Sequence, residues 1–333
     1  MRVWWRALRY HFVPPSILPA TLGAAVALSV DHTFYPFYFL LVLTGVVVNH
    51  VALNMADDYF DHKHAVDNSK PEEKNPYAGG SGTLGSGLIR PSAMFRVFVI
   101  CFSVTVAIGL YLTVARGLPV LLFFLFGVLC SVFYTAPPIS FSHHGLGELG
   151  QLVNFGTTIG LGSYFVQTQK LTLQAFVATL PLGIMLFSMI IINEIPDCQE
   201  DRLAGKLTLV ARCGKRVGVR LYLASWVCTY TVIALGALFG VLPLTALLAF
   251  ASLPLALRSM HTLRENYEDP VRLAPANLGM IEAHSVTSLG LIAAYSIQGA
   301  ASHANIGQLL FLLLLLAAFY APATLAFRKP GKT

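Results

Sequence analysis

The feature that most constrains this chain is a set of long apolar stretches without charged residues. Residues 35–53, "YPFYFLLVLTGVVVNHVAL", contain no Asp, Glu, Lys or Arg. A helix needs about 20 mainly apolar residues to cross the hydrocarbon core of a bilayer. Of all 333 residues, 56% are hydrophobic and 11% are charged, whereas soluble domains carry about 25% charged residues. The chain is therefore predicted to be an all-α, polytopic membrane protein.

Ten stretches meet this length criterion, so we predict a single membrane domain over residues 1–333 with ten spans. The basic N-terminal residues are followed by no small-residue cleavage pattern, and we expect no cleaved signal peptide. The predicted spans are residues 13–30, 36–58, 93–114, 117–136, 147–166, 173–194, 218–240, 242–260, 277–298 and 306–327.

The basic residues predict how these spans are oriented. Of the 22 Lys and Arg, all but Arg116 and Lys170 flank the spans on the side that holds the N-terminus. Lys and Arg concentrate in cytoplasmic loops, so we expect a protein of the cell membrane with both termini in the cytoplasm. This asymmetry and contact with anionic lipid account for the net charge of +6. We expect no nucleic-acid partner, and nothing indicates an obligate protein partner.

The first of two acidic segments, "NMADDYFDHKHAVD", follows the second predicted span. Residues four apart share one face of a helix. Asn54 and Asp58 are therefore expected to line up with His50, with Asp61 three residues further along the same stripe. Asp57 is expected to point about 100° away from this stripe.

The second acidic segment, "NEIPDCQEDRLAGKLTLVARCG", follows the sixth predicted span. It repeats the four-residue spacing in Asn193, Asp197 and Asp201. Pro196 removes a backbone hydrogen bond within the segment and is expected to kink or end the helix there. Both segments lie on the predicted cytoplasmic side, so their side chains could face each other across one cavity.

Carboxylate and amide oxygens in this arrangement suit Mg²⁺, which keeps several waters and shares substrate phosphates. The dipole of a helix C-terminus disfavours carboxylates, so a bound cation would offset their cost. Solvated helix ends are the alternative interpretation for either segment alone. Several cations follow the two segments and could clamp a diphosphate. They are Lys63, Lys70, Lys74, Lys206 and Arg212.

With these motifs in view, the chain resembles the UbiA superfamily of membrane prenyltransferases. Within it, the chain is similar to the 1,4-dihydroxy-2-naphthoate prenyltransferases of menaquinone synthesis. The resemblance implies nine spans around a central cavity that opens to lipid and is capped on the cytoplasmic side. The tenth span, 306–327, is then an extra peripheral helix. The motifs that carry the resemblance are "NMADDYFDHKHAVDN", "NPYAGGSGTLGSGLIRP", "FYTAPPIS", "GLGELGQLVNFGTTIGLGSYFVQT" and "NEIPDCQEDRLAGKLTLVARCG".

The resemblance implies an Mg²⁺-dependent transfer of a polyprenyl group from polyprenyl diphosphate to an aromatic acceptor. For dihydroxynaphthoate the product is demethylmenaquinone, formed with loss of CO₂ and diphosphate. Two Mg²⁺ ions are expected. The implied ligands are Asn54, Asp58 and Asp61 on one side and Asp197 and Asp201 on the other, and these four aspartates and Tyr134 form the implied catalytic set.

Further residues are assigned to the two substrates by the same resemblance. The implied diphosphate-binding residues are Arg9, Lys70, Lys206 and Arg212, and the implied acceptor-binding residues are Asn154, Glu148 and Asn193. Simpler roles stay open for several of them. Tyr134 could be an interfacial tyrosine, Arg9 a positive-inside anchor, Asn154 an interhelical hydrogen-bonding residue and Glu148 a cap. His50, Glu282 and His284 are interpreted as structural, and the "AGGSGTLGSG" stretch as a flexible lid.

Other functions stay open at the level of the sequence. The acceptor could be homogentisate, a hydroxybenzoate or a glycerol-phosphate derivative. An ion-coupled secondary transporter is an alternative from another class, although transporters place their charged residues near the membrane midplane. A metal-independent lipid-binding scaffold would leave the clustered carboxylates unexplained.

Overall fold

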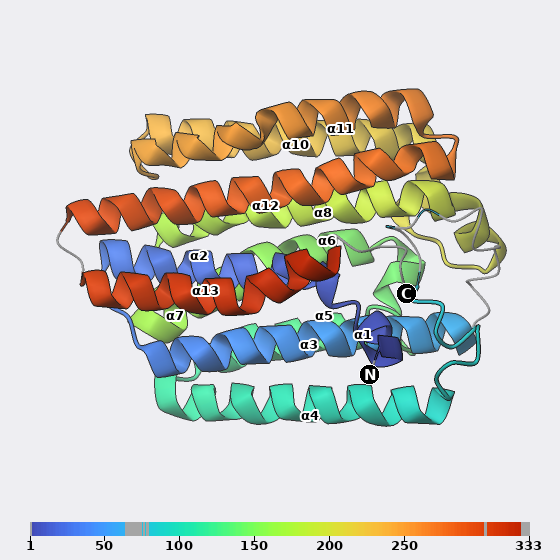
Figure 1. Cartoon of the computed structure of the whole chain (residues 1–333), viewed down its shortest axis with the longest axis horizontal. Coiled ribbons are helices and arrows are strands. Elements are labelled where there is room, and N and C mark those ends of the chain that lie inside the picture. The colour runs from blue at the N-terminus through green and yellow to red at the C-terminus, as the bar shows by residue number, and fades with distance from the viewer. Residues whose placement is uncertain (1, 64–74, 76, 78–79, 303–304, 328–333) are drawn as a thin grey trace.

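Figure 1 shows the computed structural model of the chain, a bundle whose long helices run side by side along one axis. The structure describes residues 2–63, 75, 77, 80–302 and 305–327. These residues form helices and no strand, which confirms the predicted all-α class. The α-helices are α1 (Arg2–Leu8), α2 (Pro14–Val30), α3 (Pro36–Lys63), α4 (Pro91–Arg116), α5 (Pro119–Val132), α6 (Gly147–Gln151), α7 (Ile159–Thr168), α8 (Leu173–Leu203), α9 (Leu209–Cys213), α10 (Lys215–Leu238), α11 (Leu253–Asn266), α12 (Pro270–Ala301) and α13 (Ile306–Phe327). The tighter or wider helical segments are η1 (Tyr10–Phe12), η3 (Phe141–His144), η4 (Leu152–Thr158), which is a π-helix, and η5 (Leu244–Ser252).

Each of the ten predicted spans overlaps a helix of the structure. Within the described residues, six helices are long and apolar enough to cross a membrane: α3, α4, α8, α10, the continuous η5–α11 pair and α13. Residues 3–12 and α2, bent by 45° at their junction, make a seventh if they count as one span. The total of ten spans stays a prediction.

Helix α8 continues through Pro196 to Leu203, so of the two expected effects of this proline, a kink or an end of the helix, the helix does not end there. A proline has no N–H to donate to the carbonyl four residues earlier, here that of Ile192. Asn277 of α12 supplies the missing donor, because its Nδ2 lies 3.3 Å from Ile192 O. The acidic residues after Pro196 therefore stay on the same helix as the span.

Helix α2 lies at the centre of the bundle, where it packs against α7, α8, α12 and α13. All of its residues except the last, Val30, are buried. Close packing is possible because the helix is rich in small residues, and a Cβ on Gly23 would collide with the Gly160 carbonyl of α7. This central helix holds in place the surrounding helices that carry the polar residues described below.

Helix α13 lies at the periphery of the bundle, and its role as an extra membrane span stays a prediction. It packs against α2, and the Tyr10 hydroxyl donates to its Phe319 carbonyl at 3.1 Å. Much of its surface, including Leu310 and Leu314, is exposed, which suits a helix that faces lipid. The start and the end of the described chain, α1 and the end of α13, lie toward the right-hand side of Figure 1.

Candidate active site

A pocket of about 200 Å³ lies between the C-terminal parts of α3 and α8. Both acidic segments contribute to its walls, as the sequence predicts. Side chains from the segment before α2, the start of α2, α6, η4 and the connections after α5 and α8 complete it. The predicted site residues that line the pocket are Arg9, Asn54, Asp61, Tyr134, Asn193, Asp197, Asp201 and Lys206.

The face of α3 that lines the pocket differs by one residue from the predicted face. It carries His50, Asn54, Asp57 and Asp61, a spacing of four, three and four residues that follows the 3.6-residue turn closely. The expectation that Asp57 turns away from the cavity is therefore wrong. Asp58 is buried but does not line the pocket.

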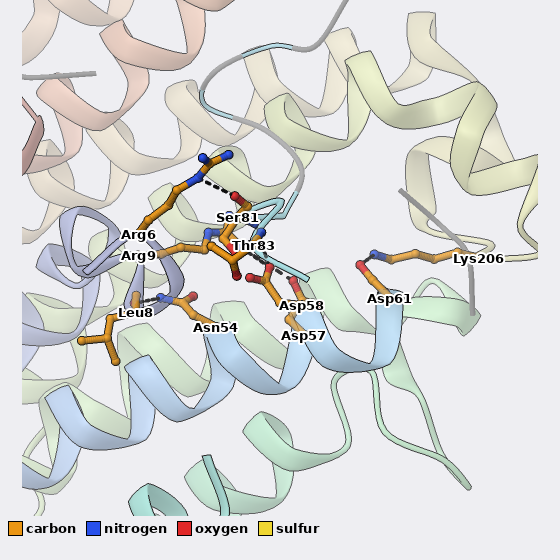
Figure 2. Close-up of polar contacts among 10 residues, drawn as sticks. All are labelled: Arg6, Leu8, Arg9, Asn54, Asp57, Asp58, Asp61, Ser81, Thr83 and Lys206. Carbon is orange, nitrogen blue, oxygen red and sulfur yellow. Dashed lines mark hydrogen bonds and ion pairs between the residues drawn. The ribbon is translucent and has the colours of Figure 1, made fainter. Parts of the chain in front are cut away.

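Asp58 contacts the glycine-containing loop after α3 (Figure 2). Its Oδ1 accepts a hydrogen bond from the Ser81 N–H at 3.0 Å, and Arg6 Nε donates to the Ser81 carbonyl at 2.8 Å. Further along this loop, Leu84 and Ile89 are buried against α1 and α3. The described part of the loop, from residue 80, is thus packed onto the bundle rather than extended as a free lid.

Two cations balance the carboxylates on α3 (Figure 2). Lys206 Nζ lies 3.0 Å from Asp61 Oδ2, and Arg9 Nη1 lies 3.9 Å from Asp57 Oδ2 and 3.8 Å from Asp58 Oδ1. Burial lowers the pKa of Lys206, but the negative charges of Asp61 and Asp57 outweigh this effect and raise the pKa well above its usual 10.5. Lys206 therefore brings a fixed positive charge to the pocket at neutral pH.

Tyr134 adds a neutral hydrogen-bonding group to the same pocket. The ordinary pKa of a tyrosine hydroxyl is about 10, far above neutral pH. The hydroxyl keeps its proton at neutral pH, so it can donate a hydrogen bond to an anionic ligand.

The donor atoms of the pocket fit Mg²⁺. The buried Oδ1 atoms of Asp57 and Asp61 have no hydrogen-bond partner among the residues that the structure describes. Within that same part of the chain, no three His, Cys, Asp or Glu side chains converge closely enough to hold a metal by themselves. Mg²⁺ commonly uses one or two carboxylates and completes its shell with water and substrate phosphates, and separate carboxylates on two facing walls suit that mode.

A second pocket, of about 120 Å³ and mostly apolar, adjoins the acidic one, and Phe155 lines both. Its walls come from α3, α4, α5, η4 and α7. Asn154, a predicted acceptor-binding residue, lines this apolar pocket instead of the acidic one. Its Nδ2 donates to Gln151 Oε1 at 3.2 Å, and Gln151 lines the acidic pocket. Both Asn154 and Phe155 belong to the π-helix η4, and π-helical turns often occur at functional sites.

Two further predicted site residues line neither pocket. Glu148 is fully buried, and its Oε1 accepts a hydrogen bond from the Leu209 N–H at 2.7 Å, which ties it to the start of α9. Arg212 is exposed, and its Nε donates to the Leu207 carbonyl at 2.9 Å. Lys70 lies outside the described residues.

Sequence reasoning missed some residues that line the acidic pocket: Asp57, Gln151, Glu194 and Glu200. Asp57 could have been found by following the average helical repeat from His50 rather than a strict four-residue step. Glu194 and Glu200 give no comparable signal, since they flank the Asn193–Asp197–Asp201 stripe. Their orientation depends on how α8 is rotated in the bundle.

The fold and the pocket define a polytopic helical membrane protein with an acidic, cation-balanced site beside an apolar cavity. Comparison with known proteins makes the assignment specific. The chain belongs to the UbiA prenyltransferase family, whose sequence profile matches residues 16–281. It is accordingly a membrane-bound prenyltransferase.

Individual relatives cover most of the chain. The 1,4-dihydroxy-2-naphthoate octaprenyltransferase of Bacillus subtilis is 23% identical over 302 residues, which are 88% of this chain and 93% of that protein. The Escherichia coli enzyme of the same name is 27% identical over 296 residues, or 86% of this chain and 93% of that protein. A UbiA homologue from Archaeoglobus fulgidus, solved with GPP and Mg²⁺, has the same fold: the TM-score is 0.64 at 12% identity, covering 90% of this chain and 99% of that one.

Proposed function

We propose that this protein transfers a polyprenyl group from polyprenyl diphosphate to 1,4-dihydroxy-2-naphthoate in an Mg²⁺-dependent reaction. The observation that carries the proposal is the convergence of both acidic segments on one pocket, beside an apolar pocket that shares Phe155. Such a pair of sites suits a substrate with an anionic head and an apolar tail. The similarity to two dihydroxynaphthoate octaprenyltransferases supports the choice of acceptor.

The diphosphate binds in the acidic pocket. Arg9 and Lys206 supply positive charge there, and the Tyr134 hydroxyl supplies a hydrogen bond. Mg²⁺, when bound, supplies Lewis-acid stabilisation of the charge that develops on the departing diphosphate. The residues proposed to hold it are Asn54, Asp57, Asp58, Asp61, Asp197 and Asp201. Asp57 is added to the ligands expected from the sequence because it lines the pocket. Asp58 is kept because it is adjacent to Asp57 on α3.

The reaction begins when the C–O bond between the prenyl group and the diphosphate breaks and its electrons leave with the diphosphate. The carbon of the electron-rich acceptor ring that carries the carboxylate then donates an electron pair to the allylic cation, which forms the new C–C bond. The ring loses its carboxylate as CO₂, and the electrons of that bond restore the aromatic ring. The product is the prenylated naphthoquinol, which is the reduced form of demethylmenaquinone.

The apolar pocket is the proposed place for the part of the polyprenyl tail next to the diphosphate. Its lining includes Phe123, Phe124 and Phe155, with Asn154 near the border to the acidic pocket. The proposed acceptor site lies at this border, with Asn154 on one side and Asn193 on the other. Glu148 contributes by holding the start of α9, to which it is hydrogen bonded.

The membrane arrangement is part of the proposal. We place the acidic pocket and both termini on the cytoplasmic side of the cell membrane, in a single domain. The distribution of Lys and Arg supports this orientation, because the exceptions lie at the opposite end of the bundle, Arg116 at the end of α4 and Lys170 in the connection between α7 and α8.

Product analysis tests the reaction and the acceptor together. Purified protein in lipid nanodiscs is incubated with a polyprenyl diphosphate, Mg²⁺ and, in separate reactions, dihydroxynaphthoate, homogentisate, a hydroxybenzoate or geranylgeranylglyceryl phosphate. We expect a product whose mass equals dihydroxynaphthoate plus the prenyl group minus CO₂. Removal of Mg²⁺ with EDTA should abolish its formation. Prenylation of another acceptor would refute the naphthoate assignment, and ion-coupled uptake without any product would favour a transporter.

A further inference from the structure

Three asparagine side chains form a hydrogen-bonded chain that reaches the wall of the acidic pocket. Asn75 lies in the connection between α3 and α4, Asn277 on α12 and Asn193 on α8. Asn75 Nδ2 donates to Asn277 Oδ1 at 2.9 Å, and Asn277 Nδ2 donates to Asn193 Oδ1 at 2.7 Å. Of the three, Asn193 lines the pocket. The hydrogen bonds therefore link two buried amides to a residue that lines the pocket.

A backbone N–H fixes which amide atoms donate and which accept at the Asn75 end of these hydrogen bonds. Asn75 Oδ1 accepts a hydrogen bond from the Tyr77 N–H at 3.0 Å. A backbone N–H can only donate, so the oxygen of the Asn75 amide must face Tyr77. The Asn75 nitrogen must then face Asn277, which makes Asn277 Oδ1 the acceptor.

A second backbone group fixes the same direction independently at the α8 end. Pro196 leaves the Ile192 carbonyl without its helical donor, and Asn277 Nδ2 donates to this carbonyl at 3.3 Å. A carbonyl can only accept, so the Asn277 nitrogen must face α8. Both backbone groups give the Asn277 amide the same orientation, so Asn193 must present its oxygen to Asn277.

Burial keeps the amides in this orientation. Asn75 is 3% exposed and Asn277 is 1% exposed. Rotating the Asn277 amide by 180° would bring its oxygen against two acceptors, Ile192 O and Asn193 Oδ1. Leaving buried polar groups unsatisfied in this way costs more free energy than the hydrogen bonds gain. Since Asn193 Oδ1 is engaged by Asn277, the NH₂ group of Asn193 is the part of the amide left for the pocket.

We propose that Asn277 is a positioning residue that orients the Asn193 amide as a hydrogen-bond donor to an anionic substrate oxygen. The oxygen belongs either to the diphosphate of the prenyl donor or to the carboxylate or phenolate of the aromatic acceptor. Asn193 thus acts as a donor to substrate and not as an oxygen ligand of a metal ion. The inference rests on the proposed function, because it takes the pocket to be the prenyl-transfer site.

Substitutions at Asn193 separate a donor from a metal ligand. Asn193→Asp keeps the oxygen toward Asn277 but replaces the NH₂ group with a second, negatively charged oxygen. For a donor to an anion, Asn193→Asp should weaken binding by about 10-fold or more and by more than Asn193→Ala does. For a metal ligand, Asn193→Asp should bind as well as the wild type or better, and that result would overturn the proposal.

Binding is measured without turnover, as the shift in thermal unfolding temperature on titration with each substrate alone. One titration uses a polyprenyl diphosphate with Mg²⁺, and the other uses dihydroxynaphthoate. The substrate whose affinity falls in Asn193→Asp identifies the source of the oxygen. Unchanged affinity for both would contradict the proposal. The wild-type protein could bind both substrates, and Asn193→Asp could lose affinity as expected, while no prenylated naphthoate forms. In that case the proposed reaction fails, and the donor role of Asn193 in the pocket stands.

A double-mutant cycle tests the role of Asn277. Asn277→Asp is isosteric and removes the donor, and Asn277→Ser is a neutral second variant should the buried charge prevent folding. Either should reduce affinity for the same substrate that Asn193→Asp affects, and should have no further effect on the Asn193→Ala background. The matched control is Asn266→Asp, since the Asn266 side chain donates to Thr262 O on its own helix, away from the pocket. Equal losses for both substrates, or additive losses in the double variant, would mean that Asn277 has a structural role only.

Discussion

At the scale of single residues, the acidic pocket combines carboxylates that attract a cation with two cations that attract an anion. The Lys206–Asp61 and Arg9–Asp57 pairs bring both signs of charge to the wall of the pocket that α3 forms. In the proposed complex, the diphosphate would contact Lys206 and Arg9, and Mg²⁺ would contact the carboxylates. Each charged side chain of the two ion pairs would then have a substrate or metal partner in place of its present one. The two ion pairs leave the α3 wall close to neutral, which limits the cost of charge at this depth.

Asp57 gives the sharpest test at this scale. We expect Asp57→Asn to lower kcat/KM for the prenyl donor by about 10- to 100-fold, because one charge-assisted contact is worth about 1.5–3 kcal/mol. The thermal unfolding temperature should change little, since the amide keeps the size of the carboxylate. Glu265→Gln on α11 is the matched control, because that carboxylate is 61% exposed and lies outside the pocket. Wild-type kinetics in Asp57→Asn would contradict its role in the pocket.

Some of these residues could be predicted from the sequence and others could not. The stripe of Asn193, Asp197 and Asp201 follows from helical spacing alone, because all three lie on one helix. Asn277 gives no such signal. Its partners are 84 and 202 residues away along the chain, and a single Asn in an apolar span is equally consistent with an ordinary interhelical contact. Only the packing of α8 against α12 reveals its role.

At the scale of elements, the helices are predictable because a backbone in lipid must satisfy its own hydrogen bonds. The details of the helices are less predictable. The continuation of α8 through Pro196 depends on Asn277, and the π-helix η4 lies inside an unremarkable apolar run. The approach of η4 to α8 depends on glycine, since a Cβ on Gly156 would lie 2.5 Å from Gly183 Cα.

The glycine contact predicts a difference between two similar substitutions. Gly156→Ala should destabilise the protein by about 1–3 kcal/mol, because backbone atoms of α8 cannot move aside for the methyl group. Gly150→Ala, in the preceding helix α6, should have little effect, since a Cβ there meets no atom within 4 Å. Thermal unfolding in detergent measures both. Equal unfolding temperatures for the two variants would contradict the close packing of η4 on α8.

At the scale of the whole molecule, the bundle separates two chemically different ends. At one end, α3 and α8 carry the acidic pocket. At the opposite end, Lys170 Nζ pairs with Asp31 Oδ1 at 3.1 Å, and Arg116 Nη2 donates to the Gln167 carbonyl at 2.9 Å. These two cations are thus held by contacts with other parts of the bundle. This polarity agrees with a pocket that receives its substrates from the cytoplasmic side.

Thiol labelling tests this orientation. Cys213 on α9 is exposed, near the acidic end of the bundle. In intact cells, a membrane-impermeant maleimide should leave Cys213 unlabelled, and permeabilisation should make it reactive. Leu171→Cys in a Cys213→Ser background is the matched control, since Leu171 is 58% exposed at the opposite end. It should react in intact cells. The reverse pattern would place the pocket outside the cytoplasm.

The central claim is that the two acidic walls act together on one diphosphate, and its most direct test is release of diphosphate from a polyprenyl diphosphate. Release is measured with and without Mg²⁺ for wild-type protein, Asp61→Asn on α3, Asp197→Asn on α8 and the Glu265→Gln control. We predict Mg²⁺-dependent release that falls by about 10-fold or more in each pocket variant and is unchanged in the control. Release that is independent of Mg²⁺, or that survives in either pocket variant, would contradict the account.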